Sequence, residues 1–201
     1  MKKRRVIKTH LPLEFLPHDL LERGKVLFVA RNPKDVCVSY YHHNLSLPNH
    51  AFAGTFHQFA DLFVEDLHAY GSYWSHLQSC WRVRDHPNVK LVWFEDMKRD
   101  LPAVIQELCS FLQHPLSEDQ IEKLADYVKF ENMKKNPNSN PTAGRRMARG
   151  KTDFVRKGKV GDCDWRNYFD EERREKWDQW IQHNISSIPG LDLLENVKVN
   201  F

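Results

Sequence analysis

The fold class follows from KVLFVARNPKDVCVSYYHH, residues 25–43, which combines an apolar run, a polar turn and a segment with helical spacing. Residues 25–30 have the length and composition of a strand buried in a parallel sheet. Pro33 stands where helices commonly begin, and Val36, Tyr40 and Tyr41 recur at helical spacing. The stretch therefore predicts a strand, a short loop and a helix, which together form one βα unit.

Similar signals lie on both sides of this unit. The runs RVIKT at residues 5–9 and NVKLVWF at residues 88–94 predict two further strands. Apolar spacing predicts helices over residues 17–24, 56–83 (one or two helices), 101–112, 116–128 and 170–185. This alternation predicts an α/β fold: one three-layer domain, residues 1–201, with a central parallel sheet flanked by helices.

Composition excludes several classes of protein. The 201 residues include 30 basic and 27 acidic side chains, and this near balance argues against a nucleic-acid or lipid-surface binder. No apolar run approaches the roughly 18 residues of a membrane span, so we expect no membrane partner and a cytoplasmic location. The four cysteines are scattered, and the adjacent His42 and His43 point in different directions on a helix, so we expect no metal site.

Open α/β sheets bind ligands at the carboxyl ends of their strands, and two of the predicted strands end in polar residues suited to chemistry. Lys8 and His10 lie on the same side of an extended segment. Arg31 leaves its strand directly, and Ser39 follows in the next helix, an arrangement typical of an anion site. By position alone, His10 would more often be a structural histidine, and Arg31 could pair with Asp35.

Five motifs occur in an order that resembles the cytosolic sulfotransferases. They are KTHLP (8–12), VARNPKDVCVSYYHH (29–43), WFEDM (93–97), FENMKKNP (130–137) and RKGKVGD (156–162). The resemblance covers essentially the whole chain and implies a sulfotransferase fold of the P-loop-like type. It also implies transfer of a sulfuryl group from 3'-phosphoadenosine 5'-phosphosulfate (PAPS) to an acceptor, leaving 3',5'-ADP.

The resemblance assigns roles on the acceptor side. It implies that His10 is the general base that takes the proton of the acceptor hydroxyl, and that Lys8 lies beside the transferring group. An ordinary histidine pKa near 6.5 suits such a base. The aromatic stripe from Phe59 to Trp81 is expected to be core, with at most a few members lining an acceptor pocket.

Further roles concern the nucleotide. The resemblance implies that the 3'-phosphate is bound by two groups of residues, Arg31 with Ser39 and Arg156 with Lys157 and Gly158. It places Phe130 against the adenine ring. Phe94 stands where the family usually has a tyrosine near the adenine, so the ring is kept and the hydroxyl is lost.

The pattern departs from the family in two places. No loop of the type Y-P-K-S-G-T-x-W is present, so we interpret the sequence as the C-terminal two-thirds of the family domain, without its first strand and phosphosulfate loop, and expect an unpaired sheet edge. It is either an incomplete sequence of a normal enzyme, which we favour, or a short form with impaired catalysis. The family's dimer segment aligns with residues 166–175, where Asp170 and Glu171 argue against that interface.

The sequence therefore predicts a sulfotransferase whose partner is a small acceptor such as a phenol, alcohol or sterol, with a hydroxyl or amine as the accepting group. The alternative is a nucleotide-binding or regulatory member of the family without transfer activity. Binding of nucleic acid through the RRMARGK segment, residues 145–151, is disfavoured by the charge balance. Residues 45–58 and 136–151 are expected to form lids over the site.

Overall fold

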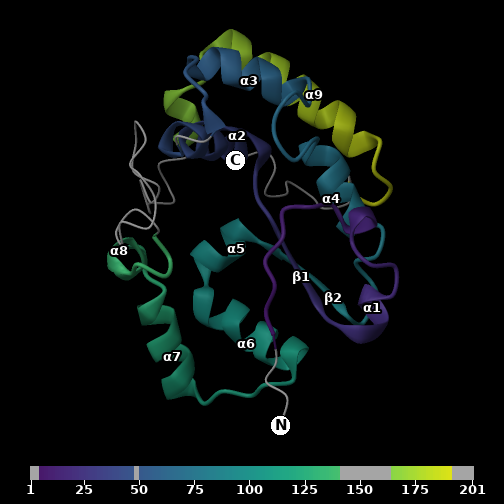
Figure 1. The fold of residues 1–201 in the computed structure, drawn as a ribbon, viewed down its shortest axis with the longest axis vertical. Coiled ribbons are helices and arrows are strands. Elements are labelled where there is room, and N and C mark those ends of the chain that lie inside the picture. The colour runs from purple at the N-terminus through teal and green to yellow at the C-terminus, as the bar shows by residue number, and fades with distance from the viewer. Residues whose placement is uncertain (1–4, 48–49, 141–163, 192–201) are drawn as a thin grey trace.

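The computed structural model describes residues 5–47, 50–140 and 164–191. Strands β1 (Val26–Ala30) and β2 (Val89–Trp93) pair in parallel at the centre (Figure 1). Val26 lies opposite Val89 and Ala30 opposite Trp93, so both strands end at the same edge of the sheet. This register brings the residues that follow each strand close together.

Helices make up most of the remaining described structure. Their bounds are α1 Leu20–Arg23, α2 Pro33–Ser46, α3 Phe56–Val64, α4 Tyr73–Trp81, α5 Phe94–Arg99, α6 Leu101–Leu112, α7 Glu118–Tyr127, α8 Phe130–Lys135 and α9 Glu171–Ser186, with 3-10 turns at Leu13–Phe15 and Asp164–Asn167. The α/β class and the βα unit at residues 25–43 are thereby confirmed. Within the described ranges, no helix is both long and apolar enough to cross a membrane.

Local capping explains where several helices begin. The Asn32 side chain accepts the backbone N–H groups of Lys34 and Asp35, and Pro33 occupies the first turn of α2. Thr55 and Ser117 each form a capping box at the start of α3 and α7. The predicted helix over residues 116–128 is confirmed with Ser117 as its cap.

Two apolar clusters hold the elements together. The first joins the sheet to α4 and α9, and the second joins α2, α3 and α9 beneath the turn at Asp164–Asn167. Trp74, Leu77 and Trp81 of α4 pack with Ile181 of α9 in the first cluster. Beside the strands, α6 is linked to β2 by an ion pair between Lys90 and Glu107 at 2.7 Å. The sheet is therefore flanked by helices, as predicted.

One side of β1 is left open in the described structure. Leu27 and Val29 are 43% and 49% exposed, and β2 is the one described strand that pairs with β1. An unpaired strand edge with exposed apolar side chains favours association with other chains. The expected unpaired edge is thus present among the described residues.

The prediction of a strand at residues 5–9 was wrong. This segment has no regular secondary structure, and Val6 and Ile7 are 97% and 78% exposed. A strand needs a neighbour for its backbone groups, and none of the described strands pairs with this segment. Apolar content alone therefore misled the prediction.

The aromatic stripe between Phe59 and Trp81 divides into two helices with a loop between them. Phe59, Phe63, Leu77 and other members are buried, but Leu67 and Tyr70 are 63% and 53% exposed. Asp66 and Tyr70 adopt positive φ angles of 58° and 71°, which break the helical path. Most of the stripe is therefore core, as predicted, and these two exposed side chains are the members that lie outside it.

A buried cation connects α2 with α9. Lys34 is 2% exposed, forms an ion pair with Asp178, and lies 4.2 Å from the centroid of the Trp165 ring. Asp178 itself is about half exposed. Removing Asp178 would leave the Lys34 charge buried without a partner. Removing Lys34 would leave the Asp178 carboxylate in contact with water, which costs less.

We predict that Asp178→Ala destabilises the protein by about 2 kcal/mol, because Lys34 would stay buried without its carboxylate. Lys34→Met should cost less than about 1 kcal/mol, since water can solvate Asp178. Urea unfolding followed by circular dichroism measures both. Asp119→Ala, which breaks the exposed pair with Lys123, is the control and should cost less than about 1 kcal/mol. A larger loss for Lys34→Met than for Asp178→Ala would contradict this account.

Candidate functional site

The turn between β1 and α2 is fixed by hydrogen bonds from two other elements. The Asn32 N–H donates to Glu95 Oε1 of α5 at 2.9 Å, and Tyr73 of α4 donates its hydroxyl to the Arg31 carbonyl at 2.8 Å. The Asn32 side chain meanwhile caps α2. The backbone that carries Arg31 is therefore held in one conformation.

The Arg31 side chain lies at the carboxyl edge of the sheet. Its guanidinium is 4.5 Å from the centroid of the Phe94 ring, and its Nη2 is 3.6 Å from Asp35 Oδ2. Arg31 Nε is buried and has no hydrogen-bond partner. The structure thus brings Arg31 and Phe94 together, and it also shows the ion pair with Asp35 that the sequence left open.

Ser39 is exposed and lies one turn beyond Asp35 on α2. Residues four apart on a helix share a face, so Ser39 follows Asp35 along the side of α2 that begins at Arg31. A guanidinium and a hydroxyl near the start of a 14-residue helix are groups that suit an anion. The unpartnered Arg31 Nε supplies a donor for such a group.

Burial shifts the pKa values around Arg31. It raises the pKa of Glu95, although the Asn32 N–H and the Arg31 charge act in the opposite direction. It also raises the pKa of Tyr73 well above its ordinary value. Burial and the Arg31 charge lower the pKa of Lys98, whose ammonium lies 5.5 Å from the centroid of the Phe94 ring.

His10 forms the second part of the candidate site. Its ring centroid lies 4.9 Å from that of Tyr70, which precedes α4. Much of His10 remains exposed, yet partial burial and the positive charge of Lys8 both lower its pKa. The Lys8 effect shows that the two side chains are electrostatic neighbours, and a neutral imidazole can accept a proton.

Sequence reasoning missed His43 as part of this region. The His43 ring lies 5.1 Å from the His50 ring and 5.7 Å from the Tyr40 ring, measured between centroids. Burial, His50, His10 and Lys8 together lower the pKa of His43 to about 4. The available signal was the dipeptide His42–His43 in α2, the helix that follows Arg31 and Asn32, which together form the turn that we call the anion turn.

Tyr70 connects the two parts of the site through the start of α4. It adopts a left-handed φ of 71°, and Gly71 follows with a φ of 74°. Such a conformation is costly for tyrosine and is found where the surrounding structure imposes it. Three residues later, Tyr73 holds the Arg31 carbonyl, so one short segment contacts both His10 and the anion turn.

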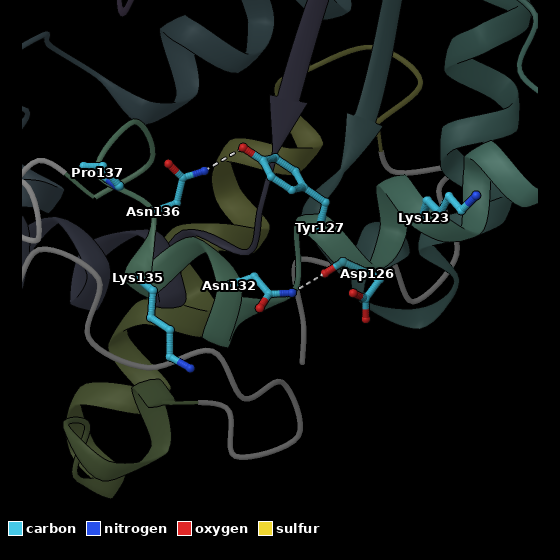
Figure 2. A pocket seen from close by; sticks show the side chains of 7 residues that line it. All are labelled: Lys123, Asp126, Tyr127, Asn132, Lys135, Asn136 and Pro137. Carbon is cyan, nitrogen blue, oxygen red and sulfur yellow. Dashed lines mark hydrogen bonds between the residues drawn. The ribbon is translucent and has the colours of Figure 1, made fainter.

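Phe130 begins α8, and its ring centroid lies 6.0 Å from the Lys134 ammonium. A concavity of about 670 Å³ between α7 and α8 is lined by Lys123, Asp126, Tyr127, Asn132, Lys135, Asn136 and Pro137 (Figure 2). Its amide groups are used within the lining: Asn132 donates to the Asp126 carbonyl and Asn136 to the Tyr127 hydroxyl, both at 2.7 Å. None of the candidate site residues that the structure describes lines this concavity.

The second predicted phosphate clamp, Arg156, Lys157 and Gly158, lies outside the described residues. The same holds for the RRMARGK segment. Among the residues that are described, no group of three or more histidine, cysteine, aspartate or glutamate side chains could hold a metal ion. The candidate residues within the described ranges are Lys8, His10, Arg31, Ser39, Phe94 and Phe130.

Comparison with known proteins identifies relatives along nearly the whole chain. A family model described as "Sulfotransferase domain" matches residues 1–189. Sulfotransferase 1B1 of Mus musculus is 37% identical over 187 residues, covering 90% of this chain and 61% of that protein. Sulfotransferase 1E1 of Homo sapiens is 35% identical over 188 residues, covering 92% and 63%. The chain thus spans less than two thirds of the length of these relatives.

Solved structures show the same likeness. The crystal structure of retinol dehydratase in complex with androsterone and the inactive cofactor PAP superposes with a TM-score of 0.85 at 34% identity, covering 94% of this chain and 55% of that one. The crystal structure of mouse sulfotransferase SULT7A1 complexed with PAP gives a TM-score of 0.83 at 28% identity, covering 98% and 70%. The chain therefore shares its fold with proteins crystallised with PAP.

The pKa of His43 predicts how stability depends on pH. His43 stays neutral in the folded protein down to about pH 4, whereas an unfolded histidine binds a proton near its ordinary value of 6.5. Unfolding therefore takes up a proton between these values, and His43 makes the protein less stable as the pH falls. We predict that His43→Leu loses less unfolding free energy between about pH 7 and pH 5 than the unaltered protein.

Urea unfolding at both pH values measures this difference. His18→Leu, at an exposed histidine, is the matched control and should lose as much stability on acidification as the unaltered protein. An equal loss in His43→Leu and the unaltered protein would contradict the proposed neutral state.

Proposed function

Because the chain belongs to the sulfotransferase family, we propose that it transfers a sulfuryl group from PAPS to the hydroxyl or amine of a small acceptor. The observation that carries the proposal is the Arg31 guanidinium, positioned over Phe94 where two parallel strands end and α2 begins. His10 contacts Tyr70, three residues before the Tyr73 that fixes this turn, and the Lys8 charge acts on His10. The two parts supply an anion site and a proton acceptor.

On the nucleotide side, Arg31 and Ser39 bind the 3'-phosphate of PAPS. The buried and unpartnered Arg31 Nε supports this role, since a charge-assisted hydrogen bond would satisfy it. The Phe94 ring already carries the Arg31 guanidinium on one face, and the adenine region of the nucleotide docks nearby. Phe130 completes the adenine contact, and Arg156, Lys157 and Gly158 complete the phosphate contact, by their place in the family motifs.

On the acceptor side, His10 removes the proton from the acceptor hydroxyl as its oxygen bonds to sulfur. The bond between sulfur and the bridging phosphate oxygen breaks, and 3',5'-ADP leaves with the electron pair. Lys8 offsets the charge that develops on the transferring group, in the way that cations assist phosphoryl transfer. A lowered pKa keeps His10 unprotonated at neutral pH, which is the state a base requires.

Phenols, alcohols and sterols are the acceptors we propose. Tyr70 offers an exposed aromatic surface in contact with His10, and His43, neutral and partly buried, lies in the same electrostatic region. Such surroundings favour an acceptor with an apolar body and one polar end. The androsterone and retinol named with retinol dehydratase have this character.

We also propose that residues 166–175 do not form a two-fold interface. The Asp170 side chain caps α9 by accepting the Arg173 N–H at 2.8 Å, and Glu171 stands in the first turn, so both charges serve the helix.

We propose a cytoplasmic location for the protein. The thiols of Cys37, Cys80 and Cys109 are free, as is usual for proteins of the reducing cytoplasm.

We predict that His10→Ala lowers kcat about 100-fold or more, because transfer would lose its general base. Transfer of radiolabelled sulfate from PAPS to a panel of phenols, alcohols and sterols measures the activity. Binding of 3',5'-ADP, measured by calorimetry, should be unchanged within about twofold. His18→Ala, at an exposed position, is the control and should retain full activity. Equal activity of His10→Ala and the unaltered protein would contradict the assignment of the base.

We predict that Arg31→Met raises the Kd for 3',5'-ADP at least about tenfold, because a charge-assisted hydrogen bond contributes about 1.5–3 kcal/mol. The Kd for 5'-AMP, which has no 3'-phosphate, should change much less. Arg23→Met removes an equal charge at an exposed ion pair with Asp19 and serves as the control. Equal losses for the two nucleotides would show that Arg31 does not read the 3'-phosphate.

A further inference from the structure

Glu95 occupies an unusual position at the candidate phosphate site. One of its carboxylate oxygens, Oε1, accepts the Asn32 N–H at 2.9 Å. The other, Oε2, is buried and has no hydrogen-bond partner in another residue, and the backbone N–H of Glu95 itself also lowers the pKa of this carboxyl group. A buried carboxylate oxygen without a donor is costly, and such groups are found more often where a ligand or a proton completes the arrangement.

The surroundings of Glu95 contain charges of both signs. Arg31 and Asp35 act on Glu95 from the β1–α2 side, and Tyr73 interacts with it from α4. On its own helix, Lys98 faces Arg31. The Arg31 and Lys98 cations together balance the Asp35 and Glu95 carboxylates, so the charge of the turn is already close to neutral.

A phosphate that binds Arg31 upsets this balance. It adds up to two negative charges beside a carboxylate that is already shielded from water, and like charges in a poorly hydrated site repel strongly. Either the phosphate binds weakly, or one of the carboxyl groups takes up a proton. Burial already raises the pKa of Glu95 and so favours its protonated form.

We propose that Glu95 is a positioning residue of the phosphate site and takes up a proton when the 3'-phosphate binds. Its Oε1 keeps the Asn32 N–H and thereby the Arg31 backbone in place in both protonation states, while its Oε2 carries the proton. Nucleotide binding and proton uptake are then linked, and by reciprocity a lower pH strengthens binding. This inference rests on the proposed function, because it takes Arg31 as the ligand of the 3'-phosphate.

The test is the Kd of 3',5'-ADP between about pH 7.5 and pH 5.5 in the unaltered protein and in Glu95→Gln. Glutamine can still accept the Asn32 N–H but cannot titrate. The phosphate groups and histidines titrate equally in both proteins, so the ratio of the two Kd values isolates Glu95. We expect the unaltered protein to tighten relative to Glu95→Gln as the pH falls, by at most tenfold per pH unit for one proton.

Two controls separate Glu95 from its neighbours. Asp96→Asn removes the same charge one residue away, and it should keep the pH dependence of the unaltered protein. Asp35→Asn removes the other carboxylate beside Arg31, and it should also keep this pH dependence. Calorimetry of Asp35→Asn in buffers of different ionisation enthalpy should show net proton uptake on binding, which tests the inference even if Glu95→Gln fails to fold.

The outcomes are distinct. A constant ratio of Kd values, or loss of the pH dependence in Asp35→Asn instead of Glu95→Gln, overturns the role of Glu95 and leaves the proposed function intact. Release of protons on binding to Asp35→Asn also overturns it. Absence of 3',5'-ADP binding at every pH overturns the proposed function and this inference together.

Discussion

The parallel pairing of β1 with β2 is the constraint on which the candidate site depends. With Ala30 opposite Trp93, Arg31 leaves the sheet beside Phe94, and the Asn32 N–H reaches Glu95. A shift of one residue in this register would turn Phe94 to the opposite face and separate both contacts. The anion turn is therefore a product of the sheet as much as of the sequence that forms it.

Burial acts in opposite directions on the two parts of the site. It lowers the pKa of His10 and His43, so these rings favour the neutral form, and it raises the pKa of Glu95, which also favours its neutral form. Around His10 the charged neighbour is the cation Lys8, whereas around Glu95 both signs are present. Limited hydration thus prepares a proton acceptor on one side and a site sensitive to added negative charge on the other.

Sequence patterns predicted what local spacing controls. The helix after Arg31 follows from Pro33 and the Asn32 cap, and the pairing of Arg31 with Asp35 follows from their separation of four residues. The prediction of a strand at residues 5–9 failed, and the exposure of Tyr70 was not foreseen. Both depend on which elements lie nearby in space, and sequence periodicity carries no information about that. The contact between Glu95 and Asn32 joins residues 63 apart in the sequence and was equally hidden.

The short segment from Tyr70 to Tyr73, which leads into α4, limits how such a protein can evolve. Tyr70 contacts His10, and Tyr73 holds the Arg31 carbonyl, so a change in the path of this segment alters both sides of the site at once. His43 and His50 lie elsewhere, near the end of α2, with ring centroids 5.1 Å apart. Under the proposed function, substitutions near the end of α2 can change the acceptor preference, whereas the start of α4 is restrained by both of its contacts.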